Sequence, residues 1–185
     1  MDKTFFSSRA ANLAEALRQH DWSNCEILAE AMSQAWKENR QVFICGNGGS
    51  CANANHWEND FLYPVSKRIG HGLRIRSLCS NPAVITCLAN DEGYEHIFSA
   101  QLRVLALAGD ILIVLSGSGN SPNIINALTC AREMGLRSFA VLGFDGGKSL
   151  KLADVPIHFQ VNDMQLAEDF QVILNHFIIR ALQAR

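Results

Sequence analysis

Short apolar runs alternate along this chain with longer segments in which apolar residues recur every three or four positions. The short runs predict buried strands, and the longer segments predict amphipathic helices. The clearest strand follows Asp110, where five consecutive residues are apolar. The predicted strands span 41–45, 73–78, 110–116, 138–144 and 155–161. The predicted helices span two segments within 4–38 and then 50–62, 81–88, 96–107, 121–135 and 163–183.

The order of these elements indicates the class of fold. Strands that alternate with helices favour a parallel sheet covered on both faces. A chain of 185 residues can bury a sizeable core, and no repeat, linker or break in composition divides this one. We therefore expect one α/β domain over 1–185, with an N-terminal helical hairpin (1–40), an α/β core (41–161) and a long C-terminal helix (162–185).

Composition and charge exclude several classes of protein. Hydrophobic residues make up 48% and charged residues 18%, which argues against a disordered chain. The net charge is −2 without a basic cluster, so we expect no nucleic-acid partner. No apolar run reaches the ~18 residues that span a bilayer, so we expect no membrane partner. The six cysteines form no CxxC pair, and together with an N-terminus unlike a signal peptide they favour a reducing, cytoplasmic location.

Two glycine-rich loops follow the first and third predicted strands. The loop 46–50 reads Gly-Asn-Gly-Gly-Ser, and the loop 116–121 reads Ser-Gly-Ser-Gly-Asn-Ser. Ligands of open α/β sheets bind beyond the carboxyl ends of strands, and helix N-termini there favour anions. Neither loop has the spacing of a Walker or dinucleotide-binding motif. Tight structural turns are the alternative, but two such loops favour a small phosphorylated ligand.

Two further groups of polar residues are candidates for chemistry. His56 and Asp60 are four residues apart, so one face of a helix would carry both, as a shared metal or proton relay requires. Glu168 and His176 are separated by eight residues, about 12 Å along a helix. All four could meet at one ion only through a bent helix or through two subunits. The alternatives are a surface hydrogen bond for His56 and Asp60, and a core histidine for His176.

The two loops together identify a family resemblance. GNGGS after one strand and LSGSGNSPN after a later one resemble the sugar isomerase (SIS) domain family, and specifically its phosphoheptose isomerase branch. ANDEGY (89–94) and GFDGGK (143–148) also resemble that branch. The resemblance implies a three-layer α/β/α fold with a flavodoxin-like, five-stranded parallel sheet. It also implies isomerisation of sedoheptulose 7-phosphate to D-glycero-D-manno-heptose 7-phosphate, for surface polysaccharides.

The resemblance further implies which residues form the site. Position by position, it assigns substrate contacts to Asn47, Gly48, Gly49, Ser50, Asn90, Asp91, Ser116, Gly117, Ser118, Ser121 and Glu168. It assigns a divalent metal, for which Zn²⁺ is one candidate, to His56, Asp60, Glu168 and His176. Asp60 would be the catalytic base and His176 its acid–base partner. Two positions depart from the family, which commonly has Glu where this chain has Asp60 and Gln where it has Glu168.

Two functions remain open from the sequence. The first is a metal-assisted isomerase of a phosphorylated sugar, which the two histidines favour. The second is a non-catalytic SIS-fold protein that binds a sugar phosphate or a protein, like the replication-initiator-binding member of the branch. The departure at Asp60 favours the second. The spacing of the proposed ligands and the resemblance both predict a homotetramer with active sites at subunit interfaces.

Overall fold

The computed structural model describes residues 4–63 and 71–184 and contains a five-stranded parallel sheet. The strand order is β2-β1-β3-β4-β5, which is the flavodoxin-like order predicted above. The strands are β1 (Val42–Gly46), β2 (Ile75–Ser77), β3 (Ile111–Ser116), β4 (Arg137–Leu142) and β5 (Val155–His158). Each predicted strand is present, although β2 and β5 are shorter than expected.

The central strands explain where the two glycine-rich loops lie. Every residue of β1 and of β3 is buried, as their continuous apolar runs require. In the register of this pair, Gly46 lies opposite Leu115. The two strands are parallel and end together, so the loops that follow them begin side by side at one edge of the sheet.

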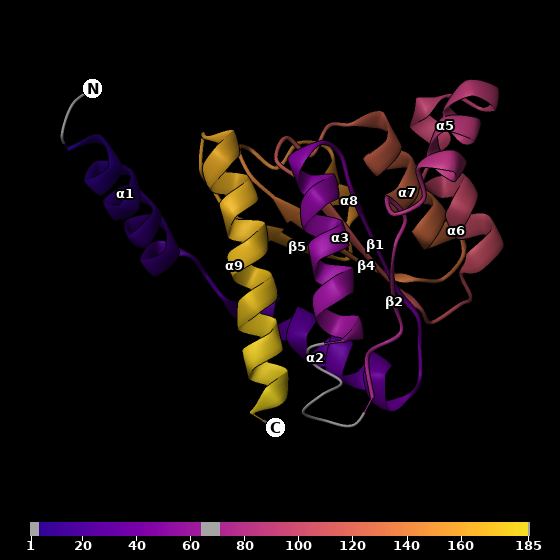
Figure 1. Cartoon of the computed structure of the whole chain (residues 1–185), viewed down its shortest axis with the longest axis horizontal. Helices are drawn as coiled ribbons and strands as arrows, with labels where there is room; N and C mark the ends of the chain where they lie inside the picture. The colour runs from indigo at the N-terminus through magenta and orange to yellow at the C-terminus, as the bar shows by residue number, and fades with distance from the viewer. Residues whose placement is uncertain (1–3, 64–70, 185) are drawn as a thin grey trace.

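Helices cover both faces of the sheet (Figure 1). One layer contains α2 (Ser23–Lys37), α3 (Gly49–Leu62) and α9 (Met164–Gln183), in which α9 packs against both of the others. The other helices are α5 (Pro82–Asp91), a 3₁₀ turn η1 (Tyr94–His96), α6 (Ser99–Leu105), α7 (Pro122–Glu133) and α8 (Ser149–Leu152). The pattern did not predict the short helix α8. No helix in the described residues is long and apolar enough to cross a membrane.

The first helix, α1 (Phe5–Gln19), corrects the expected hairpin. Both N-terminal helices are present, but α1 has no fully buried residue and lies at the edge of the molecule beyond α9 (Figure 1). Only its partly buried Leu13, Ala16 and Leu17 pack against the core among the described residues of α1. Arg9 ties it to the body, since its Nη1 lies 2.5 Å from Oδ2 of Asp163, the N-cap residue of α9. Apolar periodicity predicted the helix, but it could not indicate which surface the helix would meet.

His20, just after α1, gives the fold a predicted pH dependence. Its ring packs against Trp22, Phe159 and Phe170, and this burial lowers the pKa of His20 below its ordinary value of 6.5. The unfolded chain therefore binds this proton more readily, so the contribution of His20 to stability falls as the pH drops below about 6.5. His20→Leu should lose less stability than wild type between pH 7 and pH 5, measured as urea midpoints. Equal losses in both proteins would contradict this.

Candidate active site

Both glycine-rich loops line one pocket of about 240 Å³ at the carboxyl edge of the sheet. It is lined by Asn47, Gly48, Gly49, Ser50, Leu115, Ser116, Gly117, Ser118, Ser121, Met164 and Glu168. Nine of the eleven predicted substrate contacts, all but Asn90 and Asp91, are among these residues. The structure thus gathers residues from three distant parts of the chain around one small polar space.

The first loop brings backbone close to the pocket. Gly48 has a φ of +55°, which side-chain-bearing residues rarely adopt, and α3 starts at the next residue. Any Cβ at Gly49 would collide with both carboxylate oxygens of Glu168. These glycines therefore let the amino end of α3, with its free N–H groups, form part of the pocket wall beside Glu168.

The serines of the second loop have two different roles, one in holding the loop and one in lining the pocket. The buried Ser116 hydroxyl accepts a hydrogen bond from the Gly119 N–H at 3.1 Å, so it holds the loop closed. Ser121 is the N-cap residue of α7, yet its side chain makes no capping hydrogen bond. Ser118 and Ser121 line the pocket at the amino end of α7, where an anion is favoured.

Asn47 is fixed by two residues that sequence patterns did not single out. Asn47 and the buried Asn123 exchange side-chain hydrogen bonds of 2.9 and 2.8 Å. The Tyr94 hydroxyl also donates to Asn47 Oδ1, at 3.0 Å. The place of Asn123 directly after the second glycine-rich loop is the sequence signal that could have indicated it. The orientation of Asn47 toward the pocket thus depends on α7 and η1.

Asn90 and Asp91 lie apart from the pocket wall. They form the last turn of α5, where both are exposed, and Asn90 Nδ2 donates to Asp91 Oδ1 at 2.7 Å. Neither residue lines the pocket. The nearby Tyr94, three residues beyond Asp91, is connected to the pocket through its hydrogen bond to Asn47. Their role as substrate contacts stays a prediction.

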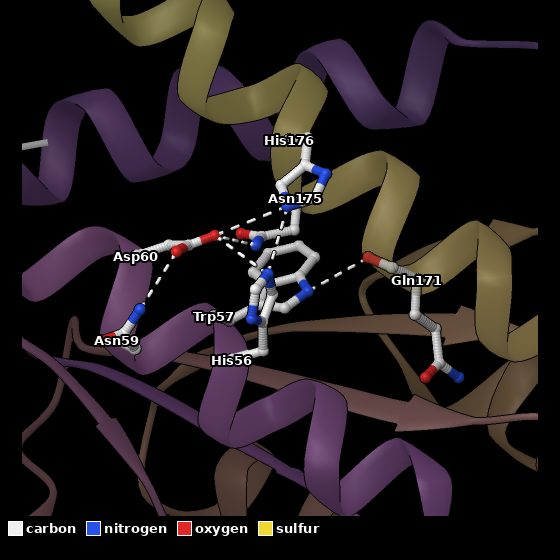
Figure 2. Close-up of polar contacts among 7 residues, drawn as sticks. All are labelled: His56, Trp57, Asn59, Asp60, Gln171, Asn175 and His176. Carbon is white, nitrogen blue, oxygen red and sulfur yellow. Dashed lines mark hydrogen bonds and ion pairs between the residues drawn. The ribbon is translucent and has the colours of Figure 1, made fainter. Parts of the chain in front are cut away.

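A second polar group forms where α3 and α9 pack together (Figure 2). His56 Nε2 lies 3.1 Å from His176 Nε2 and 3.2 Å from Asp60 Oδ2. His176 Nε2 lies 3.7 Å from the same carboxylate oxygen. Both histidines are exposed, whereas Asp60 retains 9% of its surface. The exposure of His176 excludes the alternative of a core histidine.

The spacing of these three side chains fits a metal ion. Bonds of about 2.0–2.2 Å in a tetrahedral site hold neighbouring ligand atoms roughly 3.3 Å apart. The three separations of 3.1, 3.2 and 3.7 Å match one face of such a site. His56, Asp60 and His176 could therefore hold a metal, and three protein ligands leave a position open, as in catalytic sites.

Hydrogen bonds between α3 and α9 set this geometry. Trp57 Nε1 donates to the Gln171 carbonyl at 3.1 Å, and Asn53 Nδ2 donates to Gln171 Oε1 at 2.9 Å. Asp60 accepts from Asn175 Nδ2 at 2.8 Å and from Asn59 Nδ2 at 3.2 Å (Figure 2). The two helices are therefore aligned so that Glu168 faces Gly49 and His176 faces His56.

This alignment corrects one expectation about the ligands and agrees with another. Glu168 lies beside the glycine-rich loop and is outside the metal-compatible group found among the described residues. Glu168 and His176 lie about 12 Å apart along the axis of α9, as their spacing of eight residues predicted. However, one chain is enough to bring His56, Asp60 and His176 together, so these three do not require a second subunit.

Glu58 lies on the same helix, between His56 and Asp60 in the sequence. It is half-buried, and this burial raises the pKa of its carboxyl group, although the Ser77 backbone N–H and Arg76 act in the opposite direction. It belongs to the packing of α3 on β2 and not to the histidine group.

Comparisons with known proteins identify the family of this chain. Residues 5–143 match the SIS domain family. The phosphoheptose isomerase of Aliarcobacter butzleri is 35% identical over 148 residues, covering 79% of this chain and 77% of that protein. That of Trichlorobacter lovleyi is 37% identical over 153 residues, covering 82% and 76%. The structure of phosphoheptose isomerase GmhA from Neisseria gonorrhoeae superposes with a TM-score of 0.88 and 27% identity over 100% of both chains.

The chain therefore belongs to the SIS domain family, with its doubly wound sheet and a pocket between two glycine-rich loops. Within that family, its relatives and its fold place it in the phosphoheptose isomerase branch.

Proposed function

We propose that this protein is an aldose–ketose isomerase that converts sedoheptulose 7-phosphate to D-glycero-D-manno-heptose 7-phosphate. The observation that carries the proposal is the pairing of a phosphate-type pocket with a His–Asp–His group along the same two helices. The relatives named phosphoheptose isomerase support the same activity. The non-catalytic alternative gives no reason for two histidines and a carboxylate to converge.

The separation of pocket and histidine group suits an extended substrate. His56 is seven residues beyond Gly49 on α3, which corresponds to about 10 Å along the helix. An open seven-carbon chain spans roughly 8 Å with carbon–carbon bonds of about 1.5 Å, and its phosphate adds ~2 Å. With the phosphate in the pocket, C1 and C2 would lie near the three side chains.

The chemistry then follows from the residues present. The Asp60 carboxylate takes a proton from the carbon next to the carbonyl and returns it to the neighbouring carbon. His176 moves the second proton between the two oxygens. His56, Asp60 and His176 would hold a divalent ion, which we propose is Zn²⁺, and the ion would supply Lewis-acid stabilisation of the negative oxygen. The pocket positions the reacting end by binding the remote phosphate.

The activity is tested with purified protein and sedoheptulose 7-phosphate. We expect heptose 7-phosphate to form, turnover to stop after chelation and to return when Zn²⁺ is restored. A folded protein that binds the sugar phosphate without turning it over would instead support the non-catalytic alternative.

The proposed binding of phosphate by the second glycine-rich loop gives a separate prediction. Ser118→Ala with Ser121→Ala should weaken sugar-phosphate binding by about 1–3 kcal/mol, or roughly 5–150-fold, because two hydroxyl donors are lost. Calorimetry measures the affinity. Thr129→Ala is the control, since it removes an exposed hydroxyl further along α7. Unchanged affinity in the folded double variant would remove this loop from the phosphate site.

The proposal extends to assembly and location. Phe5, Phe6 and Phe177 are 51%, 72% and 51% exposed, and covering such side chains favours a homo-oligomer. We propose a cytoplasmic homotetramer of one-domain subunits, which is consistent with six free cysteines. Sedimentation equilibrium would reveal a monomer if the assembly is wrong.

A further inference from the structure

Asn175 is a buried amide beside the histidine group that the isomerase chemistry does not explain. It is completely buried on α9, next to the buried Leu174. Its Nδ2 donates to Asp60 Oδ2 at 2.8 Å (Figure 2). Its Oδ1 is the one buried side-chain oxygen or nitrogen without a hydrogen-bond partner in the described residues.

A purely structural role does not account for this side chain. A buried amide that lacks a partner for its oxygen is less favourable than an apolar side chain of similar shape. Turning the amide over would not help, because Oδ1 would then face the carboxylate oxygen of Asp60. The unpaired oxygen is therefore the cost of pointing Nδ2 at Asp60.

The contacts of Asp60 show what this orientation achieves. Oδ2 is the carboxylate oxygen that faces His56 and His176, and Asn175 binds this same oxygen. Asn59, on the exposed side, binds the other oxygen at 3.2 Å. The two amides hold the carboxylate from opposite ends, so its rotation is restricted.

We propose that Asn175 is a positioning residue that fixes Asp60 Oδ2 between His56 and His176. The inference rests on the proposed function, in which Asp60 is both a metal ligand and the base. Asn175 and His176 are consecutive on α9, one buried and one exposed. The helix therefore approaches Asp60 from the core with an amide and from solvent with an imidazole. Outer-shell partners of this kind orient metal ligands.

The test is Asn175→Leu, which keeps the branched shape of the side chain and removes the amide. The metal-free variant should melt close to the wild-type temperature, because removal of an unpaired buried oxygen offsets the loss of the hydrogen bond to Asp60. Its affinity for Zn²⁺ alone, by calorimetry, should fall about 10–100-fold. The kcat should fall while KM for the sugar phosphate changes little, since the pocket lies about 10 Å away along α3.

The neighbouring Gln171 provides the matched control. It is also buried on α9, but its side chain is bonded at both ends, to Ser50 and to Asn53. Gln171→Met should therefore lower the melting temperature, in contrast to Asn175→Leu. Asn175→Ala is a second variant that cannot clash if leucine does not fit.

The outcomes separate this inference from the proposed function. Wild-type Zn²⁺ affinity and kcat in a folded Asn175 variant would overturn the positioning role alone. Unfolding of both Asn175 variants would make the residue structural and also overturn it. A wild-type protein that neither binds Zn²⁺ nor turns over the sugar phosphate would refute the proposed function, and this inference with it.

Discussion

Replacing His176 with alanine is expected to reduce turnover by about 10²–10⁴-fold without a comparable loss of stability. General acid–base catalysis by a positioned side chain contributes a factor of this size. His176 Nε2 lies 3.1 Å from His56 and 3.7 Å from Asp60, where it can either carry a proton or bind an ion. Its side chain is 53% exposed, so truncation leaves no core cavity.

Turnover and a melting curve on the same sample decide this prediction. His71→Ala is a suitable control, because it also removes an exposed histidine but lies outside the site. The control should keep wild-type turnover. A His176→Ala protein that melts normally and retains its kcat would remove His176 from the mechanism.

Replacing Asp60 with asparagine should have the larger effect of the two. The change preserves shape but removes the one negative charge of the group and the proposed base. Zn²⁺ affinity should fall by more than about 100-fold, because even outer-shell changes cost 10–100-fold. Turnover should fall below detection. Calorimetry with Zn²⁺ and an activity assay measure both effects, and the melting temperature of the metal-free protein reports on the fold.

Mixed oligomers of the two variants test how the site is built. Asp60 Oδ2 and His176 Nε2 lie 3.7 Å apart in one chain. Mixing Asp60→Asn and His176→Ala chains should therefore restore no activity, since every site keeps a defect. Differently tagged chains that purify together would establish that mixing occurred. Restored activity would mean that the working site takes the two residues from different subunits.

Local patterns were sufficient for most of the fold. The continuous apolar runs that became β1 and β3 can be buried on both faces only in a covered parallel sheet. The carboxyl ends of those strands then brought the two glycine-rich loops together, as predicted. The short helix α8 and the position of α1 were not predictable, because local periodicity carries little information on four-residue helices or on which surface a helix meets.

The candidate site divides in the same way. The sequence by itself determined the phosphate-type loops and the pairing of His56 with Asp60, because both depend on neighbours within one turn or one loop. Only the tertiary structure decided that His176 joins that pair while Glu168 joins the glycine-rich loop. It also decided that Asn175 binds Asp60 from the core. These choices depend on how α3 and α9 align, and contacts between residues more than 100 positions apart set that alignment.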